Sequence, residues 1–249
     1  MREKGICALC GFEAKLTFEH IPPKCSGNNK RTKGINFDSY IKGNLVNDNK
    51  ALDDLKGLKY KSMQKGMGKY SLCESCNNNT GTWYGNEYCY FSNTVASLLK
   101  KEGYEVNSMI SFTMRMKPLN VMKQIISMFC SINPATFIDQ ALRDFVLEKQ
   151  NLNFNSNKYK VSAFIYPEGM DKHLGRQGLL YNNGAIVNVS EISTYPIGFC
   201  LYKEPFYKEF MFGGEITDFK NAKYNEEHTV NLRLPVLSRK SIVANKFRQ

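Results

Sequence analysis

Hydrophobic and polar positions divide this chain of 249 residues into two regions with different patterns. Up to about residue 105 the apolar runs are short and lie between long polar stretches, and helical spacing is clear only over 92–101. Beyond residue 106 apolar positions recur more regularly. There the pattern predicts one helix that starts at Pro118 and a second that starts at Asn133-Pro134 and extends to Leu147.

Five runs rich in β-branched and aromatic residues follow the two helices. These predicted strands are 159–166, 178–189, 194–202, 210–219 and 229–237. Asn182-Asn183-Gly184 has the composition of a tight hairpin turn. The expected fold class is therefore α+β, with an N-terminal domain over 1–105 and a C-terminal domain of two helices and an antiparallel sheet over 106–249.

The N-terminal region begins with a Cys-x-x-Cys turn and a short hairpin that ends at Glu19-His20, where Pro22-Pro23 stops the strand. A polar insertion near 25–69 follows, with a helical piece predicted around 49–61. Residues 30–69 hold ten lysines and arginines against four acids. Two interpretations of the insertion stay open, a solvated linker and an arm that contacts nucleic acid.

Positive charge is concentrated in the first part of the chain. The net charge is +11; residues 1–101 hold 16 basic and 9 acidic residues, a net of +7, and the remainder contributes +4. A basic face attracts polyanions by releasing their counterions, so a nucleic acid is the expected partner, with DNA favoured. The candidate contact residues are Lys24, Lys30, Arg31, Lys33 and Lys69.

No apolar run is long enough to span a membrane and no secretory signal is recognised, so a cytoplasmic, reducing location is expected. In that setting two Cys-x-x-Cys pairs favour a metal over disulfides. Cys7, Cys10, Cys73 and Cys76 are the predicted ligands of a closed, structural zinc site. The other four cysteines are expected to be small buried hydrophobic residues: Cys25, Cys89, Cys130 and Cys200.

Glu19-His20 and Asn77 are the candidate catalytic residues. If the four cysteines share one zinc ion, the helix that begins near Asn77 is fixed next to the strand that ends at Glu19-His20. A carboxylate and an amide oxygen are ligands for a hard ion such as Mg²⁺ or Mn²⁺, and the imidazole can take a proton from an attacking water. Together with stabilisation of the leaving oxygen by the metal, these are the functions that phosphodiester hydrolysis requires.

The order Cys-x-x-Cys, Glu19-His20-Ile21-Pro22-Pro23, then Cys-x-x-Cys-Asn resembles the zinc-containing branch of the His-Asn-His (HNH) endonuclease superfamily. Its layout is similar to that of phage recombination endonuclease VII and of bacterial proteins with Glu-His-Ile-Pro-Pro. The resemblance covers residues 1 to about 91. It implies a treble-clef-like ββα-metal lobe in which His20 is the general base and Glu19 and Asn77 bind a catalytic Mg²⁺ or Mn²⁺.

The sequence departs from this family where many relatives have Asn-Leu, because this chain has Gly68-Lys69. In relatives that Asn orients the loop that carries the His. The resemblance predicts a metal-dependent endonuclease that acts on DNA, with defence against foreign DNA as its role by analogy.

Two alternatives remain open. One is a non-catalytic zinc module that binds nucleic acid or protein, and the other is an interaction or ligand-sensing role in 108–249. A homodimer or a protein partner bound through the C-terminal region is compatible with each of them.

Overall fold

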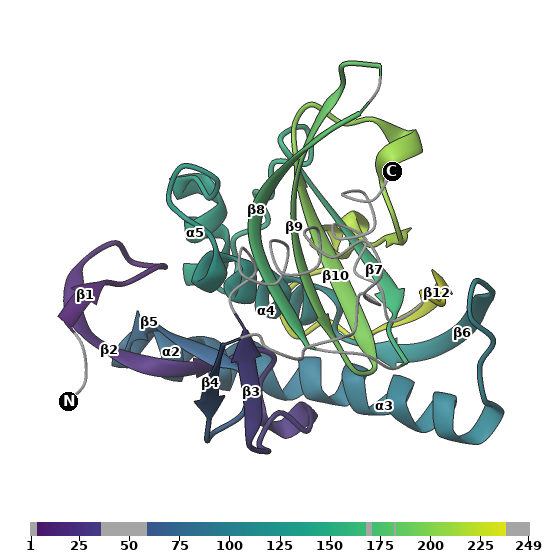
Figure 1. The fold of residues 1–249 in the computed structure, drawn as a ribbon, viewed down its shortest axis with the longest axis horizontal. Coiled ribbons are helices and arrows are strands. Elements are labelled where there is room, and N and C mark those ends of the chain that lie inside the picture. Colours follow the sequence, from purple (N-terminus) through teal and green to yellow (C-terminus); the bar gives the residue numbers. More distant parts are fainter. Residues whose placement is uncertain (1–3, 36–58, 168–170, 182, 238–249) are drawn as a thin grey trace.

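The computed structural model describes residues 4–35, 59–167, 171–181 and 183–237 (Figure 1). The strands are β1 (Lys4–Ile6), β2 (Glu13–His20), β3 (Thr32–Ile35), β4 (Tyr60–Met63), β5 (Gly68–Cys73), β6 (Met109–Met116), β7 (Tyr159–Ile165), β8 (Lys172–Leu180), β9 (Ile186–Thr194), β10 (Ile197–Lys203), β11 (Gly214–Glu215) and β12 (His228–Pro235). The α-helices are α2 (Glu74–Thr80), α3 (Asn86–Glu102), α4 (Pro118–Ile132) and α5 (Gln140–Leu147). A π-helical turn, η2 (Gly81–Gly85), joins α2 to α3, and the 3₁₀ turns are η1 (Lys24–Ser26), η3 (Lys208–Phe210) and η4 (Thr217–Asn221). The class is mixed α+β with antiparallel sheets, as the sequence predicts.

The N-terminal region is a small sheet in the order β1-β2-β5, followed by the helical segment α2-η2-α3. Cys73 caps α2 through its sulfur, which accepts a hydrogen bond from the Cys76 N–H at 3.5 Å. Gly103, with a φ of +74°, ends α3 in a conformation that a residue with a side chain rarely adopts. Figure 1 shows α3 running beneath the C-terminal sheet, so the two regions lie directly against one another.

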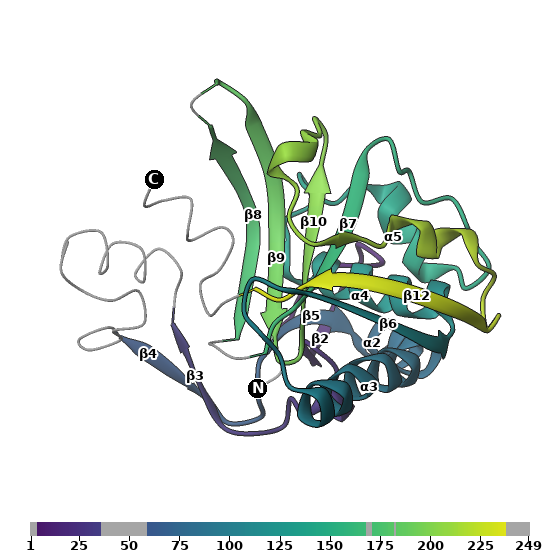
Figure 2. The same ribbon diagram turned by 90° about the vertical axis from the view of Figure 1, so that its right-hand side faces the viewer.

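The C-terminal region is a five-stranded sheet in the order β11-β7-β10-β9-β8, and a separate ribbon of β6 and β12. Figure 2 shows β12 and β6 side by side, crossing near α3 and α4. One face of the sheet packs on the central helix α4, in which only Ile132 is not buried. The other face forms a second apolar cluster with Tyr166, Leu174 and Tyr202 and with the segment 206–212.

The main hydrophobic core is continuous across the boundary predicted near residue 105. Leu16 and Leu72 of the N-terminal sheet belong to the same cluster as Ile125 of α4 and Phe199 of β10. Apolar burial therefore holds the N-terminal lobe on the C-terminal region, and the boundary between 1–105 and 106–249 stays a prediction.

Several predicted elements differ from those observed. The run 178–189 holds the ends of two strands, β8 and β9, with a turn between them where Asn182-Asn183-Gly184 predicts one: the Tyr181 N–H bonds to the Ala185 carbonyl, and Gly184 has a φ of +81°. Asn182 lies outside the described residues. The run 210–219 holds two 3₁₀ turns and only the short β11, while β6 was not predicted.

The second predicted helix starts later than expected. It begins at Gln140, because the carboxylate of Asp139 accepts the Leu142 N–H and fixes the start there. The helical piece expected around 49–61 lies outside the described residues up to 58, and Tyr60–Met63 form a strand instead. None of the helices in the described ranges has the length and apolar character needed to cross a membrane.

Lys123 of α4 is fully buried and joins three segments of the C-terminal region. Its ammonium donates to the carbonyls of Phe145, of Glu148 at 2.6 Å and of Asn151 at 2.8 Å. These carbonyls end α5 and follow it, so the lysine satisfies acceptors that the helix itself leaves unpaired. The ammonium also lies 4.3 Å from the centre of the Phe145 ring.

We expect Lys123→Met to lower the free energy of unfolding by about 2–4 kcal/mol, because it leaves the buried Phe145 carbonyl and the partly buried carbonyls of Glu148 and Asn151 without this donor. Thermal or urea denaturation measures this. Lys100→Met, on the exposed face of α3, is the control and should change stability by less than about 0.5 kcal/mol. If the two variants have the same free energy of unfolding, the hydrogen bonds of Lys123 make no net contribution to stability.

Candidate functional site

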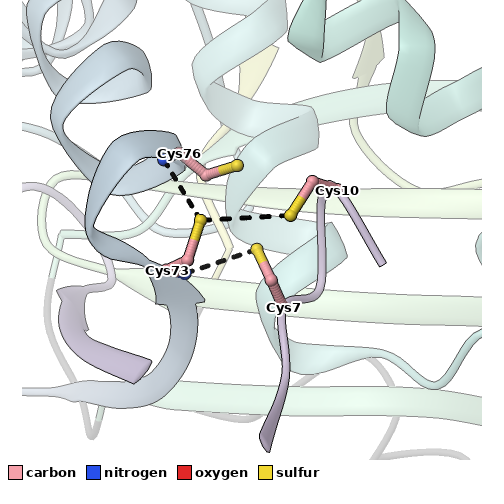
Figure 3. Close-up of side chains that lie close together, drawn as sticks. All are labelled: Cys7, Cys10, Cys73 and Cys76. Carbon is pink, nitrogen blue, oxygen red and sulfur yellow. Dashed lines mark hydrogen bonds between the residues drawn. The ribbon is translucent and has the colours of Figure 1, made fainter. Parts of the chain in front are cut away.

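The four predicted zinc ligands come together at one point. Cys7, Cys10, Cys73 and Cys76 each offer a sulfur, and the four sulfurs lie within 4.8 Å of one another. The Cys10 and Cys73 sulfurs are 3.9 Å apart, close to the roughly 3.8 Å between sulfurs around a tetrahedral zinc ion with Zn–S bonds of about 2.3 Å. Figure 3 shows the two pairs facing each other, one from the turn after β1 and one from the start of α2. This group can hold a zinc ion.

The backbone around the cysteines supports sulfur anions. The Cys73 N–H donates to the Cys7 sulfur at 3.3 Å, and the Cys76 thiol also donates to it. These hydrogen bonds, from Cys76 chiefly and from backbone N–H groups, lower the pKa of Cys7 to about 4 against the opposing effect of burial. The pKa of Cys76 is raised by its hydrogen bond to Cys7, and that of Cys10 by burial. The protein alone thus stabilises one thiolate, and a bound metal would displace the remaining thiol protons.

The first Cys-x-x-Cys turn is tied to strand β5. The Ala8 N–H bonds to the Ser71 carbonyl at 2.8 Å and the Gly11 N–H to the Cys7 carbonyl at 3.0 Å. Gly11 has a φ of +75°, as expected for the residue that turns this knuckle. The cysteines therefore connect β2, β5 and α2 into one rigid frame.

The remaining cysteines divide into two kinds. Cys130 and Cys200 are free and buried, as predicted. The expectation for Cys25 and Cys89 was wrong, because they form a disulfide between η1 and α3. Cys25 is exposed, so apolar burial does not explain it; the bond instead holds the loop after His20 on the helix.

His20 is the last residue of β2 and is partly exposed. Its Nε2 lies 3.0 Å from the Lys65 carbonyl oxygen, which can only accept, so Nε2 carries the proton. Nδ1 is then the basic nitrogen, and it has no hydrogen-bond partner among the described residues. Burial, and the charges of Lys24 and Lys65, lower the pKa of His20 and keep the imidazole neutral. This is the state that a general base requires.

Glu19 is buried, with a 5% exposed surface, and the described residues give its carboxylate no hydrogen-bond or ion-pair partner. Desolvation raises its pKa to about 8. A buried carboxylate without a partner destabilises a fold, so its presence indicates that it serves something other than stability. The Cβ atoms of Glu19 and His20 point to opposite faces of β2, since side chains alternate along a strand.

Asn77 ties α2 to β2. Its amide nitrogen donates to the Thr17 hydroxyl at 2.9 Å and to the Phe18 carbonyl at 3.3 Å, which leaves its Oδ1 without a partner in the described chain. The pairing of β2 with β5 is irregular between Thr17 and Phe18, so alternation along β2 does not place Glu19 next to Asn77. The His20 ring stands beside Phe18, with ring centres 5.0 Å apart. Within the described ranges, only the cysteines form a close group of three or more His, Cys, Asp or Glu ligands. A second metal site at Glu19 and Asn77 stays a prediction.

All five predicted nucleic-acid contacts are exposed: Lys24, Lys30, Arg31, Lys33 and Lys69. They are carried by η1, the segment after it, β3 and β5. The described part of the predicted insertion includes the antiparallel ribbon β3–β4, on which the Lys33 ammonium lies 4.3 Å from the centre of the Tyr60 ring. The ribbon is thus ordered structure that presents cations and an exposed aromatic ring.

Asn28 is a site residue that the sequence did not reveal. Its amide nitrogen donates to the carbonyls of Pro22 and Met67, each at 2.7 Å, and its Oδ1 accepts the Met67 N–H at 2.7 Å. Gly66, with a φ of +87°, allows this approach, since a Cβ there would lie 2.5 Å from the Asn28 Oδ1. Asn28 thus holds the loop after His20 against the segment before β5. Asn28 stands in a polar stretch with many asparagines, so no local sequence pattern distinguishes it from the others.

Comparison with protein-family profiles, with curated proteins and with solved structures finds no match.

We expect the purified chain to contain one zinc ion, and Cys73→Ser to lose it and to lower Tm by roughly 5 °C or more, because zinc supplies folding free energy to the lobe. Metal analysis and thermal denaturation test both points. Cys200→Ala, far from the cluster in the second apolar core, should keep the zinc. A Cys73→Ser protein with full zinc content would contradict the four-cysteine site.

We expect Glu19→Gln to stabilise the fold by up to about 4 kcal/mol at pH 8 when no Mg²⁺ or Mn²⁺ is bound. The carboxyl pKa is raised from 4.5 to about 8, so its ionisation opposes folding fully above pH 8, progressively less as the pH falls, and not at all below pH 4.5. The difference between Gln and Glu variants should therefore grow from pH 6 to pH 8. Urea denaturation in the presence of zinc but without other divalent ions measures it, and a difference independent of pH would mean that the Glu19 carboxyl is solvated.

Proposed function

We propose that this chain is a metal-dependent endonuclease of the HNH type that hydrolyses phosphodiester bonds in DNA. The observation that carries the proposal is His20: it lies at the end of a strand held by the four-cysteine cluster, with Nε2 bonded to a carbonyl and Nδ1 open. A zinc-supported imidazole with a fixed tautomer and a lowered pKa is suited to remove a proton from water.

In this proposal the lobe is a treble clef, and three features support it. A Cys-x-x-Cys turn lies between β1 and β2, β2 pairs with β5, and the second Cys pair lies at the start of α2. In this proposal zinc is structural, because four cysteine sulfurs complete a tetrahedral site and leave no position for water.

The catalytic metal would be held by Glu19 near the end of β2 and by Oδ1 of Asn77, whose amide nitrogen bonds to Thr17 of the same strand. When bound, Mg²⁺ or Mn²⁺ would neutralise the scissile phosphate and the leaving oxygen. A positive ion next to Glu19 would lower its pKa from about 8 and so ionise it. His20 activates the water, and Asn28 and the Lys65 carbonyl hold the His20 loop and ring in place.

Exposed cations surround this centre and would bind the phosphates on either side of the cut. Lys24 and Lys65 lie near His20, and the β3–β4 ribbon carries Lys33 and Tyr60 outward. A two-stranded ribbon fits into the major groove of a duplex, so this ribbon is the proposed DNA-contacting arm.

One feature favours a second candidate function, a non-catalytic zinc module that binds nucleic acid. Glu19 and His20 leave β2 on opposite faces, so β2 must twist near its end for one metal-bound substrate to reach both. In the non-catalytic alternative, Ala variants of Glu19, His20 and Asn77 bind their partner as well as the unsubstituted chain does.

Nicking of a supercoiled plasmid with Mg²⁺ or Mn²⁺ tests the proposal. We expect metal-dependent nicking that EDTA abolishes and that His20→Ala slows by about 100-fold or more, because a general base contributes about that much. His228→Ala, at an exposed histidine on β12, is the matched control and should nick at the normal rate. No cleavage of supercoiled, linear or single-stranded DNA with either metal would favour the zinc module.

A further inference from the structure

A hollow of about 450 Å³ opens beside the proposed active site. On one side it is lined by the loop after His20, through Pro23, Lys24 and Asn29. On the other side it is lined by the junction of η2 and α3, through Gly81, Gly85 and Asn86. Its volume is in the range of small-molecule sites, roughly 300–1,000 Å³.

Glu19, His20 and Asn77 do not line the hollow, but both of its walls follow them in the chain. Gly81 and Gly85 follow Asn77 by four and eight residues, so they continue the helix side that carries it. Lys24, at the opposite wall, is close enough to His20 to act on its charge. A strand whose phosphate lies at His20 and Asn77 would therefore present its adjoining nucleotide to the hollow.

The two glycines have no structural requirement that explains them. Both have ordinary right-handed helical angles, with φ near −60°. A Cβ at Gly81 would meet no atom within 4 Å, and one at Gly85 would meet only the Gln124 Oε1 at 3.9 Å. Glycine is among the least favourable residues within a helix, so alanine at either position would be better for the helix alone. The glycines give the hollow a wall of backbone without side chains. This wall belongs to a π-helical turn, a feature often found at functional sites.

The loop wall is fixed as firmly as the helical one. The Cys25–Cys89 disulfide joins it to α3, and the Asn93 amide donates to the Cys25 carbonyl at 3.3 Å. Asn28 holds the same loop to the segment before β5. The hollow is thus formed by two walls that are held apart, and it does not depend on a ligand to exist.

The chemistry of the walls points to a nucleotide. Pro23 and the glycine backbone offer apolar surface to a flat ring, the exposed amides of Asn29 and Asn86 offer donors and acceptors to its edge, and Lys24 offers a cation to its phosphate. We propose that the hollow receives one unstacked nucleobase of the substrate, next to the phosphate that is cut. This inference rests on the proposed nuclease function and adds that the substrate is single-stranded or locally unpaired at the site of cleavage.

The test separates binding from cleavage by using the His20→Ala chain. Fluorescence anisotropy measures its affinity for a labelled 12-nucleotide single-stranded DNA, and for a series in which one abasic nucleotide is moved along the strand. We expect one or two positions at which loss of the base weakens binding about tenfold, as for loss of a stacked base. Gly81→Leu, which fills the hollow, should weaken binding of the intact strand by a similar factor and remove the dependence on the abasic position.

Two further variants separate occlusion from misfolding. Gly81→Ala should raise Tm by about 2–4 °C, which shows that this position tolerates a side chain. Ser97→Leu adds the same side chain to an exposed position of α3 away from the hollow and should bind DNA normally.

Equal affinity at every abasic position would overturn the base site, and this scan needs no substitution in the hollow. If the unsubstituted chain still nicks plasmid in that case, the nuclease proposal stands alone. If the chain neither nicks nor binds any DNA, both proposals fail together.

Discussion

The fold of the N-terminal lobe depends on four sulfur atoms that converge within 4.8 Å. They connect a turn at residues 7–10 with a helix start at 73–76, across more than sixty residues of mostly polar chain. A tetrahedral metal at this point fixes the pairing of β2 with β5 and the start of α2 at once. His20 at the end of β2 and Asn77 in α2 are therefore placed by the same constraint.

The C-terminal region provides the second support, through the buried polar residues of α4. Asn120 donates to the Trp83 carbonyl in η2 at 2.9 Å, and Lys123 satisfies the carbonyls at the end of α5. Tyr84 of η2 in turn donates to the Val146 carbonyl at 2.8 Å. These bonds fix the π-helical turn to α4 and α5. The turn therefore keeps its conformation although Gly81 and Gly85 contribute no side chains to it.

The features that were predictable from sequence are those with a local pattern. Two Cys-x-x-Cys pairs predicted the cluster, apolar periodicity predicted α4, and Pro22-Pro23 predicted the end of β2. Features set by distant partners were not predictable: the Cys25–Cys89 disulfide joins residues 64 apart, and Asn28 acts on Met67 across the loop. The strand β6 was missed because its partner β12 lies more than a hundred residues later, whereas Asn182-Asn183-Gly184 marked the turn between β8 and β9.

Three features of the N-terminal lobe depart from what stability alone favours. Glu19 is a buried carboxylate without a partner in the described chain, two glycines interrupt a helix that would accept alanine, and the helix widens there into a π turn. Each lowers the stability that the zinc and the shared core supply, and none is compensated by a contact of its own. A lobe that served only as a scaffold would gain from removing all three, because each has a simple substitution that relieves it. Departures of this kind within one lobe are the pattern expected where stability is exchanged for function, which is consistent with the proposed role of the lobe.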